Sequence, residues 1–263
     1  MDSIADRINQ YLENKQINFR YEGNITFHEN LKFFIGSTSY TTFVEQKFLE
    51  EARIDAFNTK YGHYNYSEDL RSSFPNWGSR IKAKLNDLNP TLFQTSNILR
   101  VLDIGGNDGS ELCEIFGKLD NLKIHVVDIS NIAIDSGRAK YPEIEFFQSD
   151  MEAEYLNNVE LFDICLCLRS IQSRGVFSHD AIIQMCKHLK NDGIILISIP
   201  NGYKHNDKIE RGLYDHRSCL FLRTKPQELA LKIERKLIDY GFCQTGIETI
   251  DTEIVVWGKR GTV

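Results

Sequence analysis

Two acidic residues flank a glycine-rich turn near the middle of the chain. Asp103 ends an apolar stretch just before Gly105 and Gly106, and Asp108 follows them. Glycines in such a turn let a ligand lie against bare backbone. A pyrophosphate site would need the spacing Gly-x-Gly-x-x-Gly, whereas position 107 is asparagine, Asn107. Acids on both sides of the turn favour a cationic or amino-bearing ligand instead.

A second apolar segment, residues 125–130, also carries an acid near its end. Asp128 lies 25 positions after Asp103 (128 − 103) and is followed by Ile129. An acid at the end of the second strand of a strand–helix–strand unit can accept hydrogen bonds from both hydroxyls of a ribose. Asp128 is therefore a candidate ribose-binding residue.

A third apolar segment, residues 144–147, is followed by Asp150 and Met151. The Asp150 carboxylate can accept a hydrogen bond from the exocyclic amine of adenine. The thioether of Met151 can pack on the face of a purine. The three acids that follow successive predicted strands thus point to a ligand that contains adenosine.

This series resembles the class I methyltransferases that use S-adenosylmethionine, over roughly residues 97–258. The resemblance rests on Asp103-x-Gly105-Gly106-x-x-Gly109, Asp128 and Asp150. It implies that the turn passes the methionine part of the cofactor, that Asp128 holds the ribose and that Asp150 with Met151 holds the adenine. The residues we expect to contact the cofactor are Asp103, Gly105, Gly106, Asn107, Asp108, Asp128, Ile129, Asp150, Met151, Leu168 and Arg169.

Alternating strands and helices surround these residues. The apolar patterns predict strands at 98–104, 125–130, 144–147, 161–168 and 194–199, helices at 108–118, 180–189 and 226–240, and a terminal antiparallel pair at 242–250 and 253–257. A turn at Asp192-Gly193 is expected to lead into the fifth strand. Together these elements predict an α/β fold with a doubly wound, mostly parallel sheet. The resemblance implies seven strands and a Rossmann-like methyltransferase core over residues 97–263.

The first 96 residues are predicted to form a mainly helical cap or lid. Helical spacing favours helices at 1–15, 41–60 and 78–88, and residues 19–40 favour an irregular segment with a short hairpin. This part of the chain is rich in Phe and Tyr. The rings either bury the cap against the sheet or line an acceptor pocket, and both roles are compatible.

The acceptor is expected beyond the carboxyl ends of the later strands. By the resemblance, enzymes acting on DNA adenine or glutamine amides carry Asn/Asp-Pro-Pro-Tyr/Phe after the fourth strand, and residues 168–175 lack that motif. Arg169 and Arg174 either bind a carboxylate or phosphate or pair with a neighbouring acid. His205 and His216 are candidate general bases, although a loop histidine is more often simply exposed. The candidate catalytic residues are thus Arg169, His205 and His216.

The composition excludes several classes of function. The 263 residues carry a net charge of −6 and no cluster of Lys and Arg, which disfavours a nucleic-acid acceptor. The chain has no apolar run long enough for a membrane span, and its start lacks the basic region of a secretory signal, so a cytoplasmic location is expected. Six scattered cysteines form no Cys-x-x-Cys pair and the histidines form no ligand pattern, so no metal is predicted.

The leading hypothesis is a methyltransferase that uses S-adenosylmethionine and acts on O or N of a small metabolite, as in a specialised biosynthetic pathway. The protein is expected to be a monomer or a homodimer. One alternative is an RNA or protein methyltransferase, which keeps the same cofactor site. The other is a catalytically silent binding subunit, and the intact acids at 103, 128 and 150 count against it.

Overall fold

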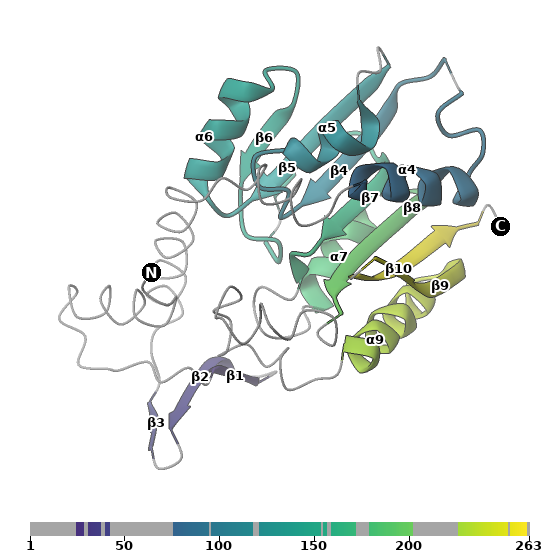
Figure 1. Cartoon of the computed structure of the whole chain (residues 1–263). Helices are drawn as coiled ribbons and strands as arrows, with labels where there is room; N and C mark the ends of the chain where they lie inside the picture. Colours follow the sequence, from purple (N-terminus) through teal and green to yellow (C-terminus); the bar gives the residue numbers. More distant parts are fainter. Residues whose placement is uncertain are drawn as a thin grey trace.

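The central feature is a seven-stranded sheet in which five consecutive strands are parallel (Figure 1). Its spatial order is β6-β5-β4-β7-β8-β10-β9, and β10 runs antiparallel to both β8 and β9. The strands are β4 (Leu99–Ile104), β5 (Leu122–Asp128), β6 (Glu145–Gln148), β7 (Phe162–Leu168), β8 (Leu189–Pro200), β9 (Phe242–Ile250) and β10 (Glu253–Arg260). The predicted fold class is confirmed. This computed structural model describes residues 25–28, 31–37, 40–42, 76–94, 96–117, 121–153, 155–156, 159–171, 179–201, 226–251 and 253–261.

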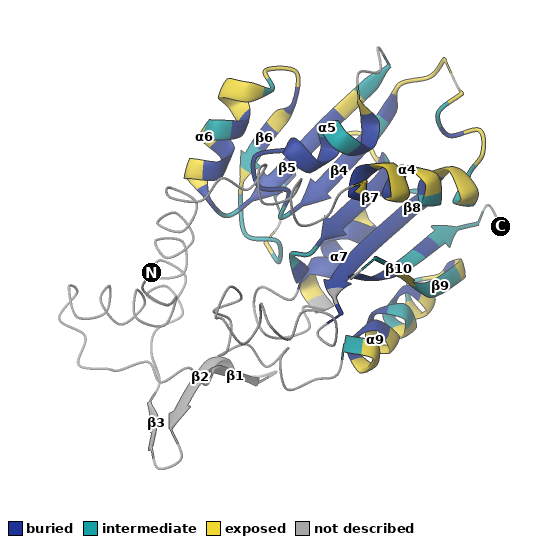
Figure 2. Cartoon of the chain, viewed as in Figure 1, coloured by how far each residue is buried: buried dark blue, intermediate teal, exposed yellow. Residues whose placement is uncertain are grey.

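Helices cover both faces of the sheet, and their apolar sides form two cores. One core lies beneath α4 (Trp77–Leu88), α5 (Ser110–Phe116) and α6 (Asn131–Lys140), and the other beneath α7 (His179–His188) and α9 (Pro226–Asp239). The central strands are dark and buried between helices whose outer sides are exposed (Figure 2). Burial on both faces explains why these strands read as continuous apolar runs. No helix in the described part of the chain is long and apolar enough to cross a membrane.

Strand β8 begins earlier than the sequence indicates. It starts at Leu189, which pairs with Phe162 of β7, and the next paired residue, Ile194, lies opposite Ile164. An advance of five residues along β8 therefore corresponds to an advance of two residues along β7. The additional β8 residues produce a shift in the pairing register. This shift contains the Asp192-Gly193 segment that was predicted as a turn, so the turn interrupts the pairing within the strand rather than preceding it.

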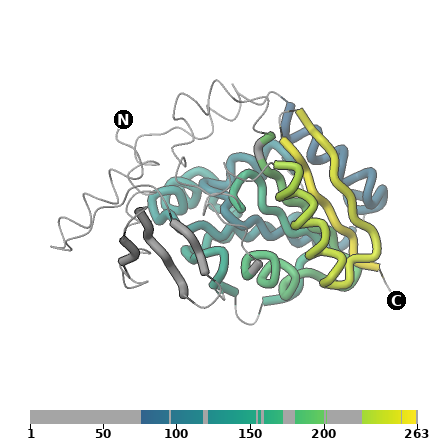
Figure 3. Tube along the Cα trace, turned by 90° about the horizontal axis from the view of Figure 1, so that it is seen from below, coloured from purple at the N-terminus to yellow at the C-terminus, as the bar shows by residue number. Residues whose placement is uncertain are grey.

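Helix α4 falls in the predicted cap segment but packs on a face of the sheet. Ile81 and Leu85 are fully buried in the same core as the strands. The Nζ atom of Lys84 lies 2.6 Å from Glu248 Oε1 on β9, and Lys259 of β10 donates to the Leu88 carbonyl at 2.9 Å. The α4 trace accordingly runs beside the β9–β10 hairpin (Figures 1 and 3). Helix α4 is thus a layer of the α/β unit.

The N-terminal part contains three short strands, mostly within the segment where an irregular stretch with a short hairpin was predicted. β1 (Ile25–His28), β2 (Leu31–Ser37) and β3 (Tyr40–Thr42) form an antiparallel sheet in the order β1-β2-β3. This sheet contains the hairpin expected within residues 19–40. Strand β3 also occupies residues 41–42, where the helix at 41–60 was expected to begin. The rest of that helix and the helix at 1–15 lie outside the described residues.

Truncation of Leu85 tests whether α4 belongs to this core. Leu85→Ala is expected to lower the free energy of unfolding by about 3 kcal/mol, because it removes a fully buried leucine side chain and leaves a cavity. The neighbouring Asn86→Ala is the control, since Asn86 is exposed and its loss should change stability by less than about 0.5 kcal/mol. Urea unfolding measures both values. Equal midpoints for the two variants would show that α4 does not share the core.

Candidate active site

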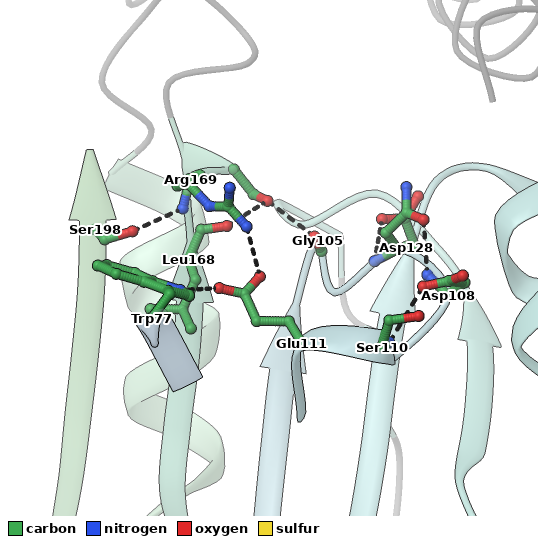
Figure 4. Close-up of polar contacts among 11 residues, drawn as sticks. Trp77, Gly105, Asp108, Ser110, Glu111, Asp128, Leu168, Arg169 and Ser198 are labelled. Carbon is green, nitrogen blue, oxygen red and sulfur yellow. Dashed lines mark hydrogen bonds and ion pairs between the residues drawn. The ribbon is translucent and has the colours of Figure 1, made fainter. Parts of the chain in front are cut away.

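Three parts of the chain come close together at the turn between β4 and α5. Gly105 has a φ of 72°, in the left-handed region that favours glycine. A Cβ atom at Gly105 would lie 2.4 Å from the Cβ of Ser170, which follows β7, and 3.9 Å from Cε of Met151, which follows β6. The Ser170 hydroxyl donates to the carbonyls of Gly105 at 2.8 Å and of Leu168 at 3.0 Å (Figure 4). The ends of three strands therefore meet at this turn.

The Asp103 carboxyl group lies directly beneath the turn. A Cβ atom at Gly106 would be 2.5 Å from Asp103 Oδ2, so only glycine leaves room for the carboxyl. Asp103 is 1% exposed, and neither carboxyl oxygen has a hydrogen-bond partner among the described residues. Burial raises the pKa of Asp103 well above its usual range. The Glu111 and Asp128 carboxylates add to this rise, and Arg169 opposes it.

Hydrogen bonds of the Asp128 carboxylate join the same turn to the end of β5. Its Oδ2 accepts a hydrogen bond from the Asn107 amide at 3.0 Å, and its Oδ1 accepts one from the Ser130 amide at 2.8 Å. Burial raises the pKa of Asp128, and these two hydrogen bonds, with one from Ile129, partly offset the rise. Each carboxylate oxygen has a further lone pair, so Asp128 can still accept from a ligand hydroxyl.

Asp108 has a structural role that the sequence did not reveal. Its Oδ2 accepts from Lys140 Nζ at the end of α6 at 2.5 Å, and its Oδ1 accepts from the Ser110 amide at the start of α5 at 3.1 Å. Burial alone would raise the pKa of Asp108, but the hydrogen bonds from Lys140 and Ser110 outweigh it and lower the pKa. Asp108 thus joins two helices beside the turn, and its contact with the cofactor stays a prediction.

The side chain of Asn107 belongs to the same glycine-rich turn. Its φ is 53°, and its Oδ1 accepts from the Asp108 amide at 2.8 Å, which fixes the orientation of the side chain. Asn107 Nδ2 is buried and has no hydrogen-bond partner among the described residues. The turn therefore offers one unsatisfied donor and one unsatisfied carboxyl.

The end of β6 supplies the third predicted acid. Asp150 Oδ1 accepts from the Glu152 amide at 3.0 Å, which orders the segment that carries Met151. The carbonyl of Ile129 accepts from Gln148 Nε2 at 3.3 Å, and the Ser149 amide donates to the Asp128 carbonyl at 3.0 Å. These contacts hold the ends of β5 and β6 side by side.

Arg169, at the end of β7, is bound to an acid rather than open to solvent. Its backbone has a φ of 56°, and its amide donates to the carbonyl and hydroxyl of Ser198 on β8 at 3.1 and 3.0 Å. Its guanidinium donates to Glu111 Oε2 at 3.1 Å and lies 5.9 Å from the centre of the Trp77 ring. The Trp77 indole donates to the other Glu111 oxygen (Figure 4). Of the two roles expected for Arg169, the structure shows the ion pair.

All the residues predicted to contact the cofactor lie at the carboxyl ends of β4, β5, β6 and β7 or in the segments that follow them. His205, His216 and Arg174 lie outside the described residues. The sequence did not reveal Trp77, Glu111 or Ser170, because their partners are far away along the chain and no local pattern marks them. Among the described residues, no group of three or more His, Cys, Asp or Glu side chains is placed to hold a metal ion.

A family described as "Methyltransferase domain" matches residues 66–247, which is more than half of the chain. The chain belongs to this family. The match confirms the predicted enzyme class and S-adenosylmethionine as its cofactor. It begins ahead of α4, in agreement with the packing of α4 on the sheet. No curated protein matches the chain.

Solved structures share the fold of this methyltransferase at low sequence identity. The plantazolicin methyltransferase BamL, in complex with a triazolic desmethylPZN analog and SAH, is 17% identical with a TM-score of 0.57, over 77% of this chain and 79% of that one. Magnesium protoporphyrin IX methyltransferase (ChlM) from Synechocystis PCC 6803, with bound SAH, is 18% identical with a TM-score of 0.51, over 82% and 95%. A putative S-adenosyl-L-methionine-dependent methyltransferase from Methanococcus maripaludis is 16% identical with a TM-score of 0.54, over 75% and 91%.

The residues of the turn fit the amino-acid end of S-adenosylmethionine. That end carries an ammonium and a carboxylate, and the turn holds an unsatisfied carboxyl on Asp103 and an unsatisfied amide donor on Asn107. An unpaired buried polar group costs free energy, and a ligand that pairs with it recovers that cost. The methyltransferase thus has both complementary groups in one turn.

The protonation of the Asp103 carboxyl group predicts that cofactor binding depends on pH. The ligand ammonium pairs with ionised Asp103, whereas the raised pKa keeps the free protein protonated at this position at low pH. Affinity for S-adenosylhomocysteine should therefore rise from pH 5 upward and level off above the pKa of Asp103. Isothermal titration at several pH values measures the slope, and Asp103→Asn should flatten it. An equal slope in both proteins would assign the effect to another group.

Proposed function

We propose that this methyltransferase transfers the methyl group of S-adenosylmethionine to an oxygen or nitrogen atom of a small molecule, in a biosynthetic pathway. The observation that carries the cofactor assignment is the buried Asp103 carboxyl, which lies under the glycine turn without a described partner. Asp128 and Asp150, which follow the next two strands, support it. The net charge of −6 favours a small acceptor over a nucleic acid.

The proposed roles of the cofactor-binding residues follow their order along the edge of the sheet. Asp103 and Asn107 hold the amino-acid end, Asp128 accepts from the ribose hydroxyls, and Asp150 with Met151 holds the adenine. The remaining predicted contacts, from Leu168 and the glycine turn, shape the backbone around the cofactor. When bound, S-adenosylmethionine supplies a methyl group on a positively charged sulfur. The protein needs mainly to align the acceptor with this group and to exclude water.

The proposed acceptor lies beyond the ends of β7 and β8, near Arg169. His205 and His216 follow β8 in the sequence and are the proposed general bases for an acceptor that must lose a proton. The names of two structural neighbours, a plantazolicin methyltransferase and magnesium protoporphyrin IX methyltransferase, are consistent with acceptors other than nucleic acid. Residues ahead of α4 are proposed to form the cap, and the protein is proposed to act in the cytoplasm as a monomer or homodimer.

Neutral variants of two strand-end acids test the cofactor assignment. Asp103→Asn and Asp128→Asn should each weaken binding of S-adenosylhomocysteine about 10- to 100-fold, because each removes a charged hydrogen-bonding partner worth about 1.5–3 kcal/mol. Asp135→Asn is the matched control, since the Asp135 side chain is 70% exposed on α6. Isothermal titration gives the three affinities. Wild-type affinity in both test variants would refute the assignment.

Methyl transfer itself is tested with a labelled donor and a small-molecule extract of cells. Mass spectrometry should find a labelled small molecule with the wild-type protein, and about 10- to 100-fold less of it with Asp128→Asn when the donor is limiting. Labelled RNA or protein in place of a small molecule would contradict the proposed acceptor class while leaving the cofactor site intact.

A further inference from the structure

Glu253 is a buried acid at the same edge of the sheet. It is the first residue of β10 and pairs with Pro200, the last residue of β8. Side chains alternate between the two faces of a strand, so Glu253 shares a face with Val255 and Trp257. Val255 and Trp257 pack in the core beneath α4 and α5. The Glu253 side chain thus lies on the α4 face, at the carboxyl ends of β7 and β8.

The Glu253 carboxyl group is buried without a hydrogen-bond partner in the described part of the chain. The residue is 0% exposed, and neither carboxyl oxygen has a hydrogen-bond partner among the described residues. Asn201, which follows Pro200, is 8% exposed, and its Oδ1 also lacks a partner in the described part of the chain. Each residue therefore has an acceptor oxygen to which no described group donates a hydrogen bond. A ligand that satisfied them would have to bring N–H or O–H groups.

The charges around Glu253 favour a cationic ligand over an anionic one. Arg169 and Glu111 are the charged groups that act on it in the described structure, and the Arg80–Asp251 ion pair joins α4 to the adjacent β9–β10 turn. The charge of Arg169 is already balanced by Glu111 at 3.1 Å. Burial raises the pKa of Glu253 to about 8, Arg169 opposes the rise and Glu111 adds to it. An anion placed here would meet two carboxyl groups and a guanidinium that is already paired.

We propose that Glu253 binds the methyl acceptor, that the acceptor is an amine, and that Glu253, in place of His205 or His216, takes the proton that the amine loses. This inference rests on the proposed function and names the acceptor class for the same site. The proposal selects nitrogen over the oxygen acceptors that the proposed function leaves open, because the charges around Glu253 favour a cationic ligand.

The proton balance of the reaction gives Glu253 its role. The neutral amine nitrogen forms a bond to the methyl carbon with its lone pair, and the electron pair of the broken sulfur–carbon bond stays on sulfur. The methylated nitrogen is then positively charged and gives one proton to a Glu253 carboxylate oxygen. An amine that arrives protonated first gives up its extra proton to water, so that the Glu253 carboxylate is still ionised when the methylated nitrogen loses its proton. A carboxyl that titrates near neutral pH suits this exchange.

Paired probes test the acceptor class without knowledge of the natural substrate. We would measure the thermal stability of the protein, saturated with S-adenosylhomocysteine at pH 8.5, with primary amines from ethylamine to tryptamine. Each amine is matched with its alcohol, from ethanol to tryptophol. At least one amine should stabilise the wild-type protein at a concentration about tenfold lower than its alcohol does. No difference between any amine and its alcohol would overturn the proposal.

Two variants assign the effect to Glu253. Glu253→Gln should remove the preference for the amine, because the isosteric amide carries no charge and accepts no proton. Glu248→Gln is the matched control: Glu248 lies on the neighbouring strand and pairs with Lys84 at 2.6 Å, so the preference should persist. Retention of the preference in Glu253→Gln would overturn the proposal. Titration of the same proteins with S-adenosylhomocysteine reports separately on the cofactor site, so failure of that site is distinguishable.

Discussion

The arrangement of the site depends on the burial of the Asp103 carboxyl under the backbone of Gly106. The carboxyl lies where a Cβ atom at position 106 would be, so the turn must contain glycine there and must pass close over β4. The turn is held in this position from both sides, by Asp128 through the Asn107 amide and by Ser170 through the Gly105 carbonyl. Burial of an unpaired acid costs free energy in the folded protein, and binding of a cation that pairs with the acid offsets this cost. The glycine turn and the buried Asp103 carboxyl therefore act together as one structural unit.

Glu111 links the glycine turn and Asp103 to the rest of the molecule. It accepts from Trp77 on α4 and from Arg169 at the end of β7, so a single buried carboxylate connects two helices and a strand end. It also raises the pKa of Asp103, while Arg169 lowers it. Burial is the main cause of the raised pKa of Asp103, and two groups of the α4 contact, Glu111 and Arg169, modify it in opposite directions. This coupling gives α4 a reason to lie against the α/β core rather than above the strand ends.

The fold and the grouping of three acids at one edge of the sheet could be predicted because their signals are local. An apolar run, an acid and a glycine turn occupy consecutive residues, and parallel strands carry such residues to a common edge. The partners of Arg169 and Trp77 could not be predicted, since Glu111 lies 58 and 34 positions away from them. The position of α4 was missed for the same reason: its contacts with Glu248 and Lys259 join opposite ends of the chain. Glu253 gave no signal either, because an acid at the start of a strand is ordinarily exposed.

The unsatisfied groups at this edge of the sheet differ from one end to the other. Under the glycine turn a donor and an acceptor, on Asn107 and Asp103, lie close in sequence, and this pair suits a zwitterion. At the start of β10, beside the end of β8, the unsatisfied atoms are the carboxyl oxygens of Glu253, and we propose that they suit a nitrogen that bears protons. In our proposal, the glycine-turn end of this edge therefore binds the methyl donor and the Glu253 end binds the acceptor, and Arg169, whose charge is balanced by Glu111, lies between them.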